Sequence, residues 1–418
     1  MAFKESELVF DWNTVTTTRP ALRVPETMDE SLRDGIQSPS VTDPPVEQKK
    51  KLLSLMDGLG ITWADVGLPG AGPRAVADSL ALVQHIRDAR LSIKACCAAR
   101  TLVKDIEPVA EIQQKSGVHV VAYTFLGTSP IRQYAEAWDL DRLMKTVEEA
   151  LGWAQQHNVE VAFVTEDTTR SSPATLEKLF RQAIGLGARR LVLCDTVGHA
   201  TPHGVAALIR WTRALVADTR TDVGLDWHGH NDRGLGVVNA LAAYEAGVDR
   251  LHGTALGVGE RVGNASMDLL LLNLRLMGAW PHDLGKMVEY TRFAAEIFGV
   301  ETPYNYPLAG RDAFRTATGV HAAAVIKAEQ KGESWLADRV YSSVPAAEFG
   351  LEQVIEVGPM SGMSNVRYWL KRRGVAQDET LCQVILDAAK QTNRLLTDDE
   401  LWALVKKQGG NTAAAAQA

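Results

Sequence analysis

Short apolar runs alternate with longer amphipathic segments between residues 25 and 285. Each run is followed by a helix-type pattern, as in residues 45–59 and 139–156. Eight such units, roughly 30 residues apart, predict an α/β fold and favour a closed (β/α)8 TIM barrel over an open sheet. The predicted strands are residues 26–32, 63–67, 91–97, 118–126, 159–164, 190–195, 223–227 and 250–254.

The alternation stops after Trp280 and Pro281. Helical patterns cover residues 284–298, 321–331 and 379–406, and the Pro- and Gly-rich residues 301–319 predict a linker. The last ten residues are small and polar, and we expect them to be flexible. The sequence therefore predicts three parts: a barrel over residues 25–285, a mainly helical C-terminal extension over residues 286–408, and a flexible tail over residues 409–418.

Composition excludes several classes of protein. The chain has 418 residues, of which 46% are hydrophobic and 23% charged, with a net charge of −7. These values are ordinary for a globular protein, and mild acidity without basic runs argues against nucleic acid as a partner. The longest apolar stretch, residues 267–276, is too short and too polar to span a membrane. The N-terminus lacks a secretory signal and the four cysteines lack a Cys-x-x-Cys spacing, so we expect a cytoplasmic protein with reduced thiols.

Polar residues follow five of the predicted strands. In a barrel of this type, the side chains that carry chemistry lie at the C-terminal ends of the strands. These polar side chains therefore converge at one mouth of the barrel, and the convergence predicts an active site. The residues are Arg33, Asp34 and Gln37 after the first strand, Glu166 after the fifth, Thr196 after the sixth, His228 and His230 at the seventh, and Asn264 in the loop after the eighth.

Two of these histidines form a His-x-His pattern at a strand end. His228 and His230 are two residues apart on an extended segment, so both side chains leave the same face. Together with the carboxylate of Asp34, they could hold one divalent metal ion and leave positions open for substrate oxygens. The alternative is a pair of hydrogen-bonded loop histidines, but Asp34 and Asn264 converge on the same mouth and favour a metal. The residue types suit Mn, Mg, Zn or Co and do not choose among them.

Four motifs in the barrel resemble those of one enzyme family. The motifs resemble those of the acetyl-CoA-condensing branch of the metal-dependent barrel enzymes, which comprises 2-isopropylmalate, homocitrate and citramalate synthases. The resemblance extends from about residue 26 to residue 358. It implies a metal-dependent acyltransferase that condenses acetyl-CoA with a 2-oxo acid, giving a 2-hydroxy-2-alkyl dicarboxylic acid and CoA. The motifs are Ser-Leu-Arg-Asp-Gly-Ile-Gln at residues 31–37, Asp-Thr-Val-Gly at 195–198, His-Gly-His-Asn-Asp at 228–232 and Gly-Val-Gly-Glu-Arg-Val-Gly-Asn at 257–264.

The resemblance also implies residue roles. Metal ligands would be Asp34, His228 and His230, with Asn264 as a further ligand. The 2-oxo acid would be held by Arg33 and Thr196, with Gln37 and Glu166 as further polar residues of the active site. Arg33 would also stabilise the alkoxide that develops during the condensation.

Two further residues are implied beyond the barrel. Thr-Gly-Val-His, ending at His321, resembles the segment that supplies a catalytic histidine to the neighbouring subunit's active site, and Tyr341 resembles the tyrosine that assists it. Without the resemblance, His321 reads as a surface residue at the start of a helix. With it, His321 becomes the base that removes a methyl proton from acetyl-CoA, and a homodimer is implied.

Departures from the family narrow the substrate. Homocitrate synthases have a His at the end of strand three and an Arg-x-Ser before the strand-five Glu; the matching positions here are Cys97, Ala162 and Val164. Without those cationic partners, burying the distal carboxylate of 2-oxoglutarate is costly. The sequence thus favours a 2-isopropylmalate synthase-like enzyme. Arg100 and Arg132 could still bind an anionic substrate tail, so a homocitrate-, citramalate- or phosphonomethylmalate-type synthase stays open.

The main competing reaction is cleavage by an enzyme similar to 3-hydroxy-3-methylglutaryl-CoA lyases. Those lyases carry a cysteine in the glycine-rich loop after strand eight, and residues 257–264 contain none. A non-enzymatic barrel is disfavoured because every position of the predicted metal site keeps a side chain able to bind metal. Condensation is therefore the favoured prediction.

Overall fold

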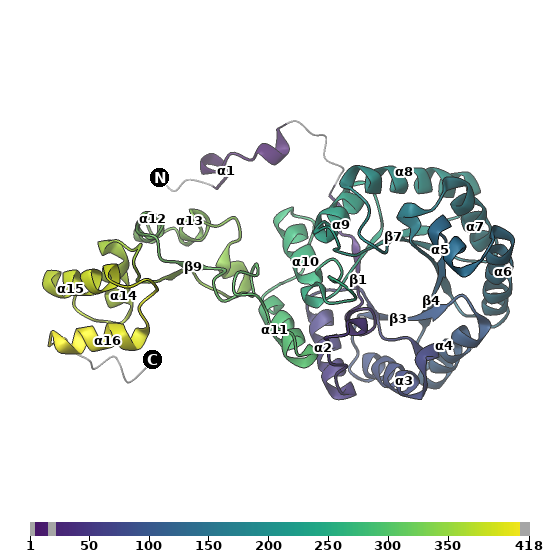
Figure 1. Ribbon diagram of the computed structural model, residues 1–418, viewed down its shortest axis with the longest axis horizontal. Helices are drawn as coiled ribbons and strands as arrows, with labels where there is room; N and C mark the ends of the chain where they lie inside the picture. The colour runs from purple at the N-terminus through teal and green to yellow at the C-terminus, as the bar shows by residue number, and fades with distance from the viewer. Residues whose placement is uncertain (1–4, 16–21, 410–418) are drawn as a thin grey trace. The chain divides into compact units, whose positions relative to one another are not determined.

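A closed barrel forms the first of two compact units in the computed structural model, which describes residues 5–15 and 22–409 (Figure 1). All eight strands are parallel and pair in chain order, and β8 pairs with β1 to close the barrel. The predicted (β/α)8 barrel is thus confirmed. Its strands are β1 (Glu26–Asp29), β2 (Trp63–Asp65), β3 (Lys94–Arg100), β4 (Val120–Gly127), β5 (Val161–Glu166), β6 (Arg190–Asp195), β7 (Gly224–Gly229) and β8 (Arg250–Gly253).

Helices surround the barrel, and local sequence signals set their ends (Figure 1). The hydroxyl of Ser172 accepts a hydrogen bond from the backbone N–H of Thr175 and starts α7, which has a proline in its first turn. α4 ends at Gly117, whose φ of 69° is the left-handed conformation that glycine adopts most easily. The helices of this unit are α2 (Val46–Gly58), α3 (Pro73–Asp88), α4 (Val103–Ser116), α5 (Pro130–Glu136), α6 (Leu140–Gln156), α7 (Pro173–Gly185), α8 (Pro202–Thr219), α9 (Gly236–Glu245), α10 (Met267–Leu276) and α11 (Met287–Phe298).

Apolar side chains fill part of the barrel interior. Successive residues of a strand point to opposite faces, so alternate residues of each strand point inward. This packed layer supports the mouth where the strands end. Its buried members are Met28, Trp63, Cys96, Val121, Tyr123, Ala162, Val192 and Cys194.

The second unit, residues 302–409 together with residues 5–15, is mainly helical, as predicted. Trp369, which is 2% exposed, lies in an apolar core with Val366, Ile385 and Leu401. A short parallel sheet joins residues 315–316 to residues 354–355. The elements are α1 (Glu5–Leu8), β9 (Arg315–Thr316), α12 (Gly319–Gln330), α13 (Ser334–Arg339), β10 (Val354–Ile355), α14 (Met363–Arg372), α15 (Glu379–Lys390) and α16 (Asp398–Lys407).

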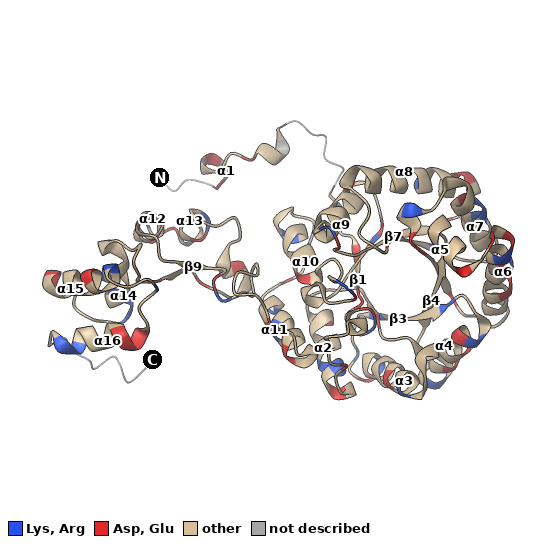
Figure 2. Cartoon of the chain, viewed as in Figure 1, with Lys and Arg blue, Asp and Glu red and all other residues tan. Residues whose placement is uncertain are grey.

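The last helix, α16, shows a charge pattern that stabilises it. Acidic residues occupy its first turn and Lys406 and Lys407 its last, so the two ends differ in sign (Figure 2). This arrangement complements the helix dipole. Beyond it, residues 410–418 of the predicted tail lie outside the described residues. Across residues 5–15 and 22–409, no helix is long and apolar enough to cross a membrane.

Candidate active site

Three side chains at or just beyond the ends of β1 and β7 form a cluster at the C-terminal end of the barrel. Asp34 lies just before the short 3-10 helix η2 (Gly35–Gln37), after the chain has left β1. His228 lies in β7 and His230 one residue beyond its end, and their ring centroids are 5.1 Å apart. Asp34 Oδ2 lies 3.9 Å from His228 Nε2 and 3.7 Å from His230 Nε2. The structure therefore brings together the three residues that the sequence predicts as metal ligands.

The donor atoms of this cluster fit a divalent metal ion. The three residues are buried, and one ligand atom from each lies within 4.8 Å of the others. Asp34 Oδ2 and Asn264 Oδ1 are buried and have no hydrogen-bond partner among the described residues. Because buried oxygens are normally hydrogen-bonded, two such atoms indicate a missing electrophile. Imidazole and carboxylate together suit first-row divalent metals, although the assignment of each ligand stays a prediction.

Electrostatics keep these groups in the forms that bind metal. Burial alone would raise the pKa of Asp34, but Arg33, His228 and His230 outweigh it and hold that pKa below its ordinary value. Burial, reinforced by the neighbouring His228, lowers the pKa of His230 to about 4. At neutral pH the cluster thus offers an ionised carboxylate and a neutral imidazole, the forms in which both residues bind metal.

The glycine-rich loop after β8 places Asn264 beside the cluster. Asn264 forms a β-bridge with His230, and its side-chain amide donates to the carbonyl of Val258 at 3.0 Å. A Cβ added at Gly259 would lie 2.2 Å from the Asn264 amide nitrogen, and one added at Gly263 would lie 1.8 Å from a backbone oxygen. The loop therefore needs glycine at both positions to wrap this closely around the asparagine.

Arg33 lies on the wall of the site and is held by three carboxylates. Its guanidinium contacts Asp34 and Asp65 at 2.7 Å each and Glu30 at 3.3 Å. Burial opposes the charged form, but the three acids outweigh it and raise the pKa of Arg33 above its ordinary value. Arg33 thus presents a fixed cation next to the predicted metal position.

A cavity of about 230 Å³ opens beside the cluster. Water occupies about 30 Å³ per molecule in the liquid, so the cavity has room for a small organic acid. The Thr196 hydroxyl accepts a hydrogen bond from the backbone N–H of Asp167, and within residues 5–15 and 22–409 no group accepts its own proton. The predicted residues that line the cavity are Arg33, Asp34, Gln37, Glu166, Thr196, His228 and His230; the apolar part of its wall is Ala98, Phe125, Val164, Val192 and Cys194.

Arg100 and Arg132 line a second cavity, of about 280 Å³, next to the first. Phe125 and Glu166 line both cavities. Arg100 is paired with Asp105 at 2.6 Å, and Arg132 lies 4.0 Å from Glu166. Burial raises the pKa of Glu166 above its ordinary value although Arg132 opposes this. The two arginines therefore line the neighbouring cavity, which shares Phe125 and Glu166 with the cavity that the metal cluster lines.

His321 and Tyr341 lie together in the second unit. His321 is in the first turn of α12, Tyr341 follows α13, and their rings stack at 4.2 Å with an interplanar angle of 30°. Both side chains are exposed. This pairing agrees with the assistance that the family resemblance implies, and a role for the pair in the chemistry of the barrel stays a prediction.

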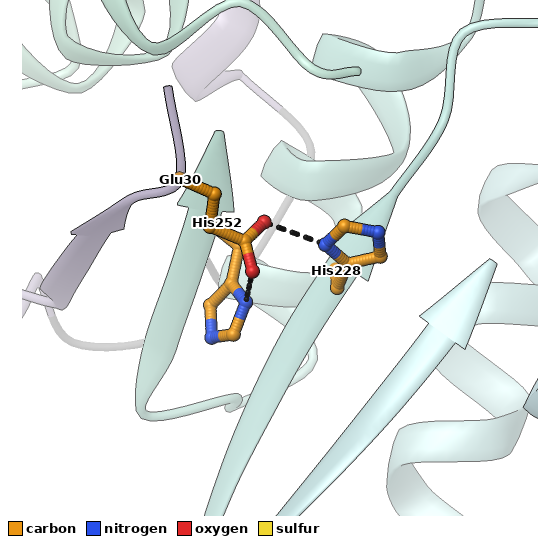
Figure 3. A group of neighbouring side chains, drawn as sticks. All are labelled: Glu30, His228 and His252. Carbon is orange, nitrogen blue, oxygen red and sulfur yellow. Dashed lines mark hydrogen bonds and ion pairs between the residues drawn. The ribbon is translucent and has the colours of Figure 1, made fainter. Parts of the chain in front are cut away.

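Sequence reasoning missed two residues of the site, Glu30 and His252. Glu30 accepts a hydrogen bond from Nδ1 of His228 at 2.6 Å and contacts Nδ1 of His252 at 3.1 Å (Figure 3). Both residues lie in predicted strands that also contain other polar residues, so the sequence did not single them out. Their partners, however, lie on other strands and become visible only with the strand pairing.

Comparisons with known proteins identify the family of the chain. The HMGL-like family model matches residues 25–293. A homocitrate synthase of Methanopyrus kandleri is 31% identical to this chain, and the match covers 87% of this chain and 86% of the synthase. A probable 2-isopropylmalate synthase of the same organism is 30% identical, and the match covers 87% of this chain and 68% of that synthase. In fold, hydroxymethylglutaryl-CoA lyase from Pseudomonas aeruginosa matches with a TM-score of 0.57 and 20% identity over 70% of this chain and 97% of the lyase. The chain belongs to the HMGL-like family.

Proposed function

We propose that the protein is a divalent-metal-dependent acyltransferase that condenses acetyl-CoA with a 2-oxo acid bearing an apolar side chain, as 2-isopropylmalate synthases do. The observation that carries the proposal is the cluster of Asp34, His228 and His230 opening on a small cavity that both polar and apolar side chains line. Relatives that are named synthases and cover most of the chain support it. The products are an alkylmalate and free CoA.

The residues divide the chemistry between them. A metal held by Asp34, His228 and His230, with Asn264, would polarise the keto group of the 2-oxo acid. The Thr196 hydroxyl donates to the substrate carboxylate. Arg33 faces the keto oxygen as that oxygen gains negative charge.

Carbon–carbon bond formation also needs a base. By family resemblance, His321 removes a proton from the methyl group of acetyl-CoA, assisted by Tyr341. The methyl carbon then bonds to the keto carbon, and water cleaves the thioester to release CoA and a carboxylate. Glu166, with its raised pKa, lies at the cavity edge and can pass a proton. Because His321 belongs to the second unit, this scheme includes a homodimer in which each subunit supplies the base to its neighbour.

The cavity wall supports an apolar substrate tail. Ala98, Val164 and Cys194 offer no cation to a distal carboxylate. Arg33 already satisfies three acids, and Arg261 at the mouth is paired with Asp232 at 2.9 Å. Burying the second carboxylate of 2-oxoglutarate there would leave it without a partner. Since the homocitrate synthase and 2-isopropylmalate synthase relatives are almost equally similar, overall identity does not select a substrate, and our choice of an apolar tail depends on the residues of the cavity wall.

Two alternatives are weaker. Arg100 and Arg132 in the neighbouring cavity would have to reach an anionic tail for a homocitrate-, citramalate- or phosphonomethylmalate-type reaction. A lyase reaction finds support only in the likeness of fold, because the loop at residues 257–264 holds no cysteine. The setting we propose is the cytoplasm, where the four buried, unpaired cysteines would stay reduced.

The test is release of free CoA, measured with a thiol reagent after the protein is loaded with Mn²⁺, Mg²⁺, Zn²⁺ or Co²⁺. Pyruvate, 2-oxoisovalerate, 2-oxoglutarate, oxaloacetate and phosphonopyruvate are compared as acceptors. We expect the highest kcat/KM with 2-oxoisovalerate, at least about 100-fold above 2-oxoglutarate, as lost pairing of one buried charge implies. No CoA release with any acceptor would refute condensation. A preference for 2-oxoglutarate would refute the inference that the cavity wall favours an apolar substrate tail.

A further inference from the structure

We propose that Glu30 is a positioning residue, which fixes the ring of His228 so that Nε2 points to the metal, and that His252 anchors Glu30 from the other side. The inference rests on the proposed metal centre and goes beyond it. All three side chains are nearly inaccessible: Glu30 is 2%, His228 8% and His252 1% exposed. Glu30 faces Nδ1 of His228 (Figure 3), whereas Asp34 lies near the other ring nitrogen, Nε2.

Glu30 uses a different oxygen for each histidine. Its Oε2 accepts from His228 Nδ1 at 2.6 Å, and its Oε1 contacts His252 Nδ1 at 3.1 Å. The carboxylate therefore cannot rotate without losing one of the two partners. A carboxylate bonded to one ring nitrogen fixes the tautomer, leaves the lone pair on the other nitrogen and increases its basicity. For His228, that second nitrogen is the Nε2 that lies 3.9 Å from Asp34.

A second metal ion between the same three residues is the competing interpretation. The ligand atoms of Glu30, His228 and His252 do lie within 4.8 Å of one another. They are, however, already bonded to each other through both carboxylate oxygens and both Nδ1 atoms (Figure 3). Neither carboxylate oxygen of Glu30 is left without a hydrogen-bond partner, in contrast to Oδ2 of Asp34. A role in orienting His228 therefore explains this group of side chains better than a second metal ion does.

A second carboxylate, that of Asp226, holds His252 in place. Its Nε2 lies 3.0 Å from Asp226 Oδ2, so two carboxylates face the two nitrogens of one ring. Burial opposes protonation of this ring, but Glu30 and Asp226 outweigh it and raise the pKa of His252. Asp226 also accepts a hydrogen bond from the Tyr123 hydroxyl at 3.0 Å. His252, which faces a carboxylate at each ring nitrogen, therefore holds Glu30 in a fixed position within the barrel.

The support is specific to one of the two histidines. Nδ1 of His230 is buried and has no hydrogen-bond partner in the part of the chain that the structure describes. Glu30 therefore sets the orientation of His228 alone. Its loss should change how one ligand binds rather than remove the site.

The experiment compares Glu30→Gln with Asp29→Asn. Asp29 is the preceding residue of β1, is 0% exposed and bonds on the other face to the Tyr290 hydroxyl, so it controls for loss of a buried acid. For each variant we measure the Kd for Zn²⁺ and Co²⁺ by competition with a chelator, and the visible spectrum of the Co²⁺-loaded protein. We expect Glu30→Gln to weaken metal binding about 10- to 100-fold and to change the Co²⁺ spectrum. Asp29→Asn should change neither.

His252→Gln is the second variant, in case Glu30→Gln does not fold. It removes the anchor but leaves the contact between Glu30 and His228, so a smaller loss of affinity in the same direction is expected. A wild-type Kd and Co²⁺ spectrum in whichever variant folds would overturn the proposal. The binding assay contains no substrate: if the wild type binds metal but releases no CoA, the proposed function fails and the role of Glu30 does not.

Discussion

Replacing Asp226 with Asn removes the charge at the centre of a buried polar network inside the barrel. Asp226 is 0% exposed. It accepts from Arg190 at 2.5 Å, from Tyr123 and His252 at 3.0 Å each, and from Arg250 at 3.5 Å. Asn occupies the same volume, so the substitution leaves no cavity and isolates the effect of charge.

The remaining acids limit the loss. Both arginines keep Glu26, at 3.0 and 2.7 Å, and His252 keeps Glu30 at 3.1 Å. Each cation therefore retains one carboxylate but loses a charge-assisted hydrogen bond, worth about 1.5–3 kcal/mol. Because breaking a buried ionic contact on one side costs about 3–5 kcal/mol, we expect Asp226→Asn to lower the free energy of unfolding by that amount.

Urea unfolding followed by circular dichroism and by tryptophan fluorescence measures this loss. Two probes are needed because the chain has two compact units and the transitions can separate. The control is Asp218→Asn, whose side chain is 67% exposed and pairs with Arg181 on the surface, and we expect it to change the free energy by less than about 0.5 kcal/mol. A loss below about 1 kcal/mol in Asp226→Asn would refute the reasoning, because the network would then contribute no more than a surface pair.

Three further predictions follow from the same geometry. His230→Ala should bind less than one tenth of the wild-type metal, measured by elemental analysis after dialysis, and release no CoA; retained metal would exclude His230 as a ligand. Burial raises the pKa of Asp29 to about 6, so this residue's contribution to stability is full below about pH 4 and falls as the pH rises through 6. Asp29→Asn stays neutral, so its free energy of unfolding should rise by about 2–3 kcal/mol relative to that of the wild type between pH 4 and pH 7. Free energies of unfolding that change equally with pH in the two proteins would contradict this prediction. Val164→Arg places a cation on the apolar wall and should lower kcat/KM for 2-oxoisovalerate at least about 10-fold while raising that for 2-oxoglutarate; an unchanged ratio would show that the tail binds elsewhere.

The barrel could be predicted because short strand-type runs, most of them apolar, alternate with helix-type patterns at a regular spacing. The predicted strand ends differ from the observed ones where side-chain carboxylates, in place of a neighbouring strand, accept hydrogen bonds from backbone N–H groups. The first strand was predicted to reach residue 32 but ends at Asp29, whose carboxylate accepts from the backbone N–H of Ser31. The third was predicted to begin at residue 91 but begins at Lys94, because the backbone N–H groups of Ser92 and Ile93 donate to Asp57.

The metal cluster was predictable for a different reason. His228 and His230 share one short segment, and Asp34 follows directly after the first strand. Glu30 and His252 could not be found in this way, because their meeting depends on the pairing of β1 with β8, where Met28 lies opposite His252. Such pairing between the two ends of the barrel sequence is absent from any local pattern. The two-residue strands β9 and β10 are likewise too short to give a periodic signal.

Because three carboxylates contact Arg33, this side chain is preorganised before any substrate binds. A free arginine gives up about 2 kcal/mol of rotamer entropy when it is immobilised. Here Asp34, Asp65 and Glu30 impose that ordering during folding. An acceptor with few atoms, and so with little binding energy to offer, can therefore be held firmly. A lysine at this position, lacking the planar fork, could not engage the three acids and the ligand at once.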